Sequence, residues 1–171
     1  FHISFIAKVR IEGLRDFGAA LSPLNAFQII QGLETLNIRI KKHSENALAL
    51  AEWLAARPEV EWVNYPGHKN SREQILAEKY LPEGASGLVT FGLKGGFEAA
   101  KKVADATLIF NIAANSGDSK SIIVHPASTT HQQLTEKQQE ATGVTPELIR
   151  LSVGLEDLRD LKTDLEQAFL A

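Results

Sequence analysis

Residues 148–154 alternate between apolar and polar side chains, which favours a β-strand with two unlike faces. Because side chains alternate along a strand, Ile149, Leu151 and Val153 point to one side of it. Arg150 points to the other side. The segment therefore predicts a sheet with one buried apolar face, and Arg150 is expected to point away from the core.

A long helix is predicted before this sheet. The Ser22-Pro23 pair is a helix start signal, because serine can cap a helix and proline is tolerated at the first helical position. The apolar stripe that follows recurs every three or four residues and consists of Ile29, Leu33, Leu36, Ile40, His43, Ala47, Leu50 and Leu54. Pro58 disfavours helical geometry in Arg57, so the helix should end by Arg57. A kink is expected near Ser44.

The remaining elements alternate between strands and helices. Strand patterns cover 60–65, 87–94, 108–112, the apolar run 122–124 and 148–153, and helices are expected over 70–80 with Asn70 as cap, 97–106, 136–140 and from Glu156 to the C-terminal region. Behind a long leading helix, this order predicts an α+β fold: a small, mostly antiparallel sheet with helices packed on one face.

Composition excludes several classes of protein. The chain has 171 residues, 44% of them apolar and 23% charged, and a net charge of −3, which suit one globular domain without an obvious nucleic-acid or membrane surface. It contains no cysteine, which fits a reducing cytoplasm, and no apolar run of the roughly 20 residues that span a bilayer. It starts at Phe1 and contains no methionine, so we expect a piece of something longer.

The first 20 residues show no sustained helical stripe and are predicted to form an arm or linker whose partner is absent. Residues 21–171 then form the domain proper. The alternative is a short helix from Ile6 to Asp16 that covers one edge of the core.

A polar loop and Arg150 are the candidate binding elements. A guanidinium on a rigid strand suits a carboxylate, because its planar fork matches the two oxygens. From spacing alone, Arg150 could equally pair with Asp118 or extend into solvent. Asn115 lies in the turn-forming loop and could instead only stabilise that turn. Ser121, Ser128, Thr129 and Thr130 could line the pocket or cap loops.

Other chemistries lack the necessary residues. His125 and His131 lie six residues apart without a third clustered ligand, so no metal is expected. A serine hydrolase would need a nucleophile-elbow motif, which the chain lacks. Gly95-Gly96 lacks the spacing and hydroxyl of a phosphate-binding loop.

These segments resemble one enzyme family. The matching segments are 18–23, 31–36, His43, 45–51, 63–67, 115–118, 121–131, 143–146 and 149–154. Together they are similar to the C-terminal part of the O-acetylhomoserine sulfhydrylases, which are pyridoxal-phosphate enzymes of cysteine and methionine metabolism. The resemblance covers nearly the whole chain and implies the C-terminal small domain of a fold-type I pyridoxal-phosphate enzyme.

The resemblance also implies roles for individual residues. Arg150 falls on the arginine that grips the α-carboxylate of the amino-acid substrate, and Asn115 falls on a loop position that contacts the same carboxylate. Asp118, Ser121 and Thr130 would support this loop. The family's cofactor-attachment lysine has no counterpart here, so no catalytic residue and no bound pyridoxal phosphate are expected in this chain.

The implied whole enzyme replaces the acetoxy group of O-acetylhomoserine with sulfide or a thiol, giving homocysteine or methionine and acetate. Its expected partners are the N-terminal cofactor-binding domain, which residues 1–20 would join, and further copies of itself in a cytoplasmic homo-oligomer. A related cystathionine γ-synthase or methionine γ-lyase, or a non-catalytic oligomerisation or regulatory module, are the alternatives.

Overall fold

The computed structural model describes residues 3–171, and packing divides the chain into two units, Phe1–Asn37 and Ile38–Ala171. We describe each unit by itself. The boundary between the units falls after Asn37 in the chain, whereas the sequence placed the start of the domain at residue 21. The assignment of 1–20 to an arm stays a prediction.

The described part of unit 1 is helical. It contains α1 (Ile3–Lys8), the π-helix η1 (Val9–Asp16) and α2 (Pro23–Glu34). The Ser22 hydroxyl accepts a hydrogen bond from Asn25 N at 3.2 Å, which confirms the predicted helix start. The local conformation of residues 6–16 agrees with the helical alternative. None of these three helices has a buried residue.

The long helix is interrupted earlier than expected. Thr35 leaves helical geometry with φ −107°, and α3 (Leu36–Ala55) begins after it. Two poor helix formers, Gly32 and Thr35, lie close together here, which explains the interruption. Helix α3 continues through Ser44 as one element, and the kink predicted there stays a prediction.

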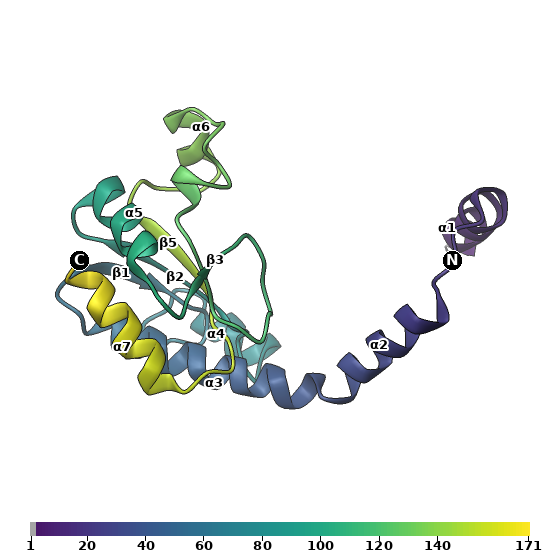
Figure 1. The fold of residues 1–171 in the computed structure, drawn as a ribbon, viewed down its shortest axis with the longest axis horizontal. Coiled ribbons are helices and arrows are strands. Elements are labelled where there is room, and N and C mark those ends of the chain that lie inside the picture. Colours follow the sequence, from purple (N-terminus) through teal and green to yellow (C-terminus); the bar gives the residue numbers. More distant parts are fainter. Residues whose placement is uncertain (1–2) are drawn as a thin grey trace. The chain divides into compact units, whose positions relative to one another are not determined.

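Unit 2 is built on a five-stranded sheet (Figure 1). Its strands are β1 (Val60–Asn64), β2 (Leu88–Leu93), β3 (Asn111–Ile112), β4 (Ile122–Val124) and β5 (Leu148–Ser152), in the spatial order β1-β2-β5-β4-β3. Only the short β3–β4 pair is parallel. The predicted mostly antiparallel sheet is therefore confirmed, with the strand that carries Arg150 at its centre.

One apolar core joins the sheet to α3, α5 (Gly96–Ala106) and α7 (Leu158–Phe169). The large side chains at its centre belong to Leu50, Leu54, Phe91, Ile149, Leu151, Leu161 and Leu165. Ile149 and Leu151 are fully buried, as their alternation predicted. The predicted α+β fold, with helices packed on one face, is confirmed.

The apolar stripe of the leading helix is only half buried. His43, Ala47, Leu50 and Leu54 are at most 2% exposed, as predicted. Ile29, Leu33, Leu36 and Ile40 are 40–58% exposed, which contradicts the expectation that they face inward. Periodicity identified the apolar face correctly, but the described residues leave its first half uncovered.

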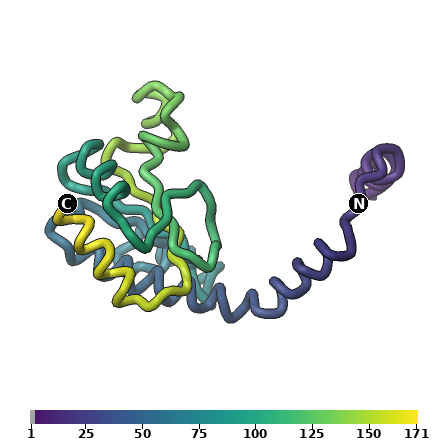
Figure 2. The backbone as a smooth tube through the Cα atoms, viewed as in Figure 1, coloured from purple at the N-terminus to yellow at the C-terminus, as the bar shows by residue number. Residues whose placement is uncertain are grey.

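Three smaller elements contribute no residue to this core. They are α4 (Gln74–Tyr80), the 3₁₀ turn η2 (Pro126–Ser128) and α6 (Glu136–Ala141). The backbone of residues 136–141, light green in Figure 2, lies apart from the sheet. Asn70 does not cap α4, which begins at Gln74; Asn70 N instead donates to His68 Nδ1 at 3.3 Å in the preceding turn. Among residues 3–171, none of the helices combines the length and apolar character needed for a bilayer crossing.

The strand predicted over 108–112 is shortened to two residues because Asp164 takes its backbone donors. This carboxylate, 3% exposed on α7, accepts hydrogen bonds from the N–H groups of Leu108, Ile109 and Phe110 at 2.7, 2.8 and 3.1 Å. A buried carboxylate with three donors ties this turn to α7.

We expect Asp164→Asn to lower the free energy of unfolding by about 2 kcal/mol, because an amide NH2 would face a backbone N–H and the charge-assisted bonds would weaken. Urea unfolding followed by circular dichroism measures this. Asp160→Asn, at an exposed position of the same helix, is the matched control. Equal losses in both variants would contradict the assignment.

Tyr65 links β1 to two neighbouring segments. Its ring is 1% exposed, and its hydroxyl donates to the carbonyl oxygen of Ser86 at 2.9 Å, with that of Ser44 at 3.4 Å. Burial raises the pKa of Tyr65 to about 12. The folded state therefore favours the neutral phenol.

This shift predicts a loss of stability in alkali. A tyrosine in the unfolded chain has a pKa of about 10. The contribution of the neutral Tyr65 phenol to the free energy of unfolding is therefore complete below pH 10 and is lost as pH rises toward about 12. We expect Tyr65→Phe to flatten the fall in urea-unfolding free energy between pH 9 and pH 11. An unchanged fall would show that Tyr65 does not titrate as described.

Candidate functional site

Arg150 lies in the middle of the central strand β5. Its register partners are Thr90 on β2 and Val124 on β4, so it is flanked on both sides by paired strands. Its neighbours Ile149 and Leu151 are fully buried on the opposite face, while Arg150 itself is half-buried. Backbone pairing on both sides holds the Cα atom of Arg150 in place.

No residue of the described range 3–171 forms a hydrogen bond or ion pair with the Arg150 side chain. The pairing with Asp118 that spacing allowed is not formed, because Asp118 Oδ1 accepts from Lys120 N at 2.9 Å. The half-buried guanidinium of Arg150 therefore has no bonded partner among residues 3–171.

The polar loop between β3 and β4 carries the other predicted binding residue. Residues 111–120 are all exposed. Asn115 Oδ1 accepts from Ser116 N at 2.9 Å, so that the side chain oxygen serves the turn and the amide NH2 stays available. Asp118 closes a second small turn through Lys120. Both side chains shape the loop.

Ser121 ends this loop and lies behind it. It is fully buried, and its hydroxyl donates to Glu156 Oε2 at 2.8 Å and accepts from Gly154 N at 2.8 Å. Ser121 therefore supports the loop from the interior. Glu156, which sequence reasoning assigned only to the start of the last helix, is the partner that this reasoning missed, because the two residues lie 35 positions apart.

In the second hydroxyl-rich loop, residues 125–131, the hydroxyl and imidazole groups form hydrogen bonds with protein groups. His125 is 1% exposed and donates from Nε2 to the Pro146 carbonyl at 2.8 Å, which leaves Nδ1 to accept from Ser128 Oγ at 2.8 Å. Thr129 Oγ1 donates to the carbonyl oxygen of His125 at 2.8 Å, and Thr130 Oγ1 shares a hydrogen bond of 2.8 Å with His131 Nδ1. These contacts give the loop its shape.

The described residues offer few side chains that could ligate a metal or attach a cofactor. Within residues 3–171, no three His, Cys, Asp or Glu side chains cluster as metal ligands. Every lysine of that range is exposed except Lys162, which is half-buried on α7. A lysine that holds an aldehyde cofactor usually lies in an enclosed site.

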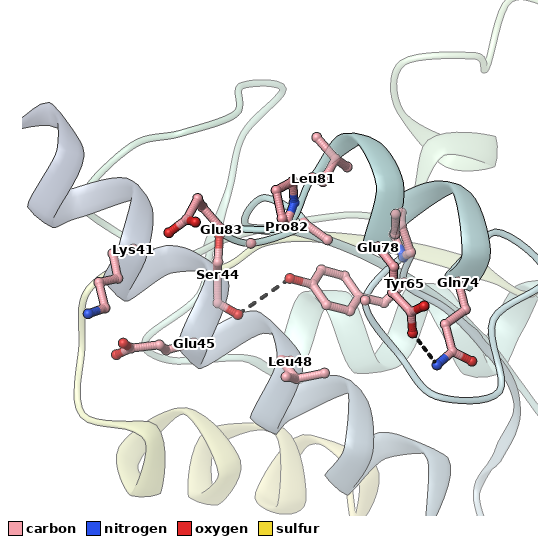
Figure 3. A pocket seen from close by; sticks show the side chains of 15 residues that line it. Lys41, Ser44, Glu45, Leu48, Tyr65, Gln74, Glu78, Leu81, Pro82 and Glu83 are labelled. Atoms are coloured by element: carbon pink, nitrogen blue, oxygen red, sulfur yellow. Dashed lines mark hydrogen bonds between the residues drawn. The ribbon is translucent and has the colours of Figure 1, made fainter.

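A separate cavity of about 350 Å³ lies between α3 and α4 (Figure 3). Its walls include Ser44, Leu48, Tyr65, Glu78 and Leu81. No residue of β5 or of the Asn115 loop lines it. It is therefore distinct from the Arg150 site.

The comparisons agree on one family. A family model described as Cys/Met metabolism PLP-dependent enzyme matches residues 4–170. The chain is 53% identical to the O-acetyl-L-homoserine sulfhydrylase of Leptospira meyeri over 168 residues, which cover 98% of this chain and 38% of that protein. It is 47% identical to O-acetyl-L-homoserine sulfhydrylase 1 of Thermus thermophilus over 97% of this chain and 39% of that protein.

A solved structure matches equally well. The crystal structure of a Campylobacter jejuni protein assigned as an O-acetylhomoserine (thiol)-lyase aligns with a TM-score of 0.90 and 47% identity, over 100% of this chain and 40% of that one. It contains N'-pyridoxyl-lysine-5'-monophosphate. The chain spans about two fifths of the length of these relatives. By the match over residues 4–170, the chain belongs to the family of pyridoxal-phosphate-dependent enzymes of cysteine and methionine metabolism.

Proposed function

We propose that this chain is the C-terminal, substrate-carboxylate-binding part of an O-acetylhomoserine sulfhydrylase. The whole enzyme breaks the bond between the γ-carbon and the acetoxy oxygen of O-acetylhomoserine and forms a carbon–sulfur bond in its place. Sulfide gives homocysteine and a methyl thiol gives methionine, with acetate as the second product. The names of the relatives support the sulfhydrylase over a cystathionine γ-synthase or a methionine γ-lyase.

The Arg150 guanidinium is the observation on which the proposal depends. It lies on the central strand and has no bonded partner in residues 3–171. A carboxylate can accept two parallel N–H bonds from one guanidinium, which defines both the position and the orientation of the substrate. Such positioning contributes several kcal/mol toward lowering a reaction barrier in enzymes generally.

The Asn115 loop is the second contact in this proposal. The Asn115 NH2 group is free of the turn bond that its oxygen accepts, so it can donate to the same carboxylate. Asp118 and Ser121 hold the C-terminal end of the loop through Lys120 N and Glu156. Thr130 supports the neighbouring loop through His131.

Pyridoxal phosphate, when bound, supplies the electron sink that makes elimination at the γ-carbon possible. In this proposal the attachment lysine belongs to the N-terminal domain, and this chain's residues bind and orient the amino-acid substrate. The chain alone is then catalytically inactive.

The N-terminal domain is also the proposed partner of the uncovered apolar surface. On α2, Phe27 is 58% exposed and Ile30 is 55% exposed, in addition to Ile29 and Leu33 of the stripe at 53% and 58%. Soluble proteins rarely leave large contiguous apolar patches uncovered. We therefore assign residues 1–20 to an arm that joins the cofactor domain, within a cytoplasmic homo-oligomer.

In the full-length enzyme, Arg150→Lys should raise the KM for O-acetylhomoserine at least tenfold, because an ammonium cannot form the bidentate fork. Steady-state kinetics with a saturating thiol measures the change. Arg159→Lys, whose arginine pairs with Asp157 on the surface, is the control and should leave the KM unchanged. An unaltered KM in Arg150→Lys would remove this residue from the site.

A second experiment tests the division of the enzyme into two parts. The purified 171-residue chain mixed with pyridoxal phosphate should not develop the visible absorbance of lysine-bound cofactor. Co-expression with the N-terminal part should restore sulfhydrylase activity. A stand-alone regulatory module would show no activity in either case, and lysine-bound cofactor on the isolated chain would contradict the proposed division.

A further inference from the structure

The loop that carries Asn115 has no apolar core of its own. Its residues 113–120, between β3 and β4, are all exposed, so burial cannot hold it in one place. Two backbone N–H bonds connect it to the end of β5: Gly117 N donates to Ser152 Oγ at 3.0 Å, and Leu155 N donates to Ser119 O at 2.9 Å. The loop depends on these bonds and on its attachment at Ser121.

Glu156 makes that attachment with both carboxylate oxygens. Its Oε1 accepts from Ser121 N at 2.6 Å, and its Oε2 accepts from Ser121 Oγ at 2.8 Å. The same Ser121 hydroxyl accepts from Gly154 N at 2.8 Å, so it donates one hydrogen bond and accepts another. Bonds to a carboxylate are stronger than bonds between neutral groups.

The segment that carries Glu156 is itself fixed to α3. Asn46 Nδ2 donates to the carbonyl oxygens of Gly154 and Glu156, both at 3.0 Å. His43 Nδ1 contacts the Val153 carbonyl oxygen at 2.6 Å. Glu156 therefore extends from a rigid base, and a displacement of Ser121 cannot be absorbed by movement of the segment 153–156.

Gly154 permits this close approach. A Cβ at this position would meet the backbone atoms Ser119 O and Ser121 N at 2.5 and 2.6 Å, and also Glu156 Oε2. Only glycine lets the loop and the end of β5 lie this close together.

We infer that Glu156 is a positioning residue for the carboxylate site, and this inference rests on the proposed function. Ser121 lies six residues after Asn115, and Glu156 lies six residues after Arg150. The Glu156–Ser121 bonds join these two segments and so set the distance between the two groups that bind one substrate carboxylate. Glu156 itself does not touch the substrate.

The test uses Glu156→Gln in the full-length holoenzyme. A glutamine retains one acceptor oxygen. If that oxygen faces Ser121 N, the NH2 group faces Ser121 Oγ, whose proton then loses its acceptor, and the remaining bonds lose the carboxylate charge. We expect the KM for O-acetylhomoserine to rise about tenfold, with kcat and the KM for sulfide changed less than threefold. Hydrogen exchange of the amides in 113–120 should become faster.

Glu59→Gln is the matched control, because both oxygens of the half-buried Glu59 accept bonds from Arg57 far from the loop in sequence. It should leave the KM and the loop exchange unchanged. Should Glu156→Gln fail to fold, Ser121→Ala removes the hydroxyl's bonds to Glu156 and Gly154 and should change both readouts in the same direction.

Unchanged exchange and unchanged KM in Glu156→Gln would overturn the inference. Faster exchange with an unchanged KM would also overturn it, since Glu156 would then order the loop without serving the site. The proposed function is judged separately by Arg150→Lys, which removes the guanidinium fork but leaves the Glu156–Ser121 bonds in place. The two ideas can therefore fail independently.

Discussion

The hydrogen bonds around residues 153–156 join three parts of unit 2 that apolar packing would leave independent. Asn46 and His43 on α3 hold the backbone after β5, and Ser121 holds the loop before β4. Each donor or acceptor is buried or half-buried, so an unmade bond would cost more than a surface bond gains. The position of the exposed Asn115 loop relative to the central strand follows from this set of bonds.

The position of Arg150 depends on apolar packing, because the apolar side chains on the other face of β5 anchor that strand. Ile149 and Leu151 are fully buried among α3, α5 and α7, which fixes the register and direction of β5. The alternation then leaves Arg150 on the other face, where its side chain is half-buried. A half-buried charge keeps part of its hydration, which avoids the high cost of a fully buried unpaired charge. In the proposed function, a substrate carboxylate replaces this water.

Local patterns predicted the elements, and contacts between distant residues decided the rest. The order of strands and helices, the α+β fold and the orientation of Ile149 and Leu151 followed from periodicity. The shortened β3 did not, because Asp164 takes its backbone donors from a helix more than 50 residues away. The support of the Asn115 loop was missed for the same reason, since Glu156 looked like an ordinary acidic residue at a helix start.

The leading helix shows what periodicity cannot supply. One stripe with constant spacing is buried from His43 to Leu54 and exposed from Ile29 to Ile40. The pattern states which face is apolar, but burial requires a second surface, and that surface is a property of the assembled protein. Arg150 is the polar counterpart of this case: its fork has no complement in residues 3–171. In the proposed function these two features have one explanation: the N-terminal domain covers the apolar face, and a substrate carboxylate pairs with the guanidinium.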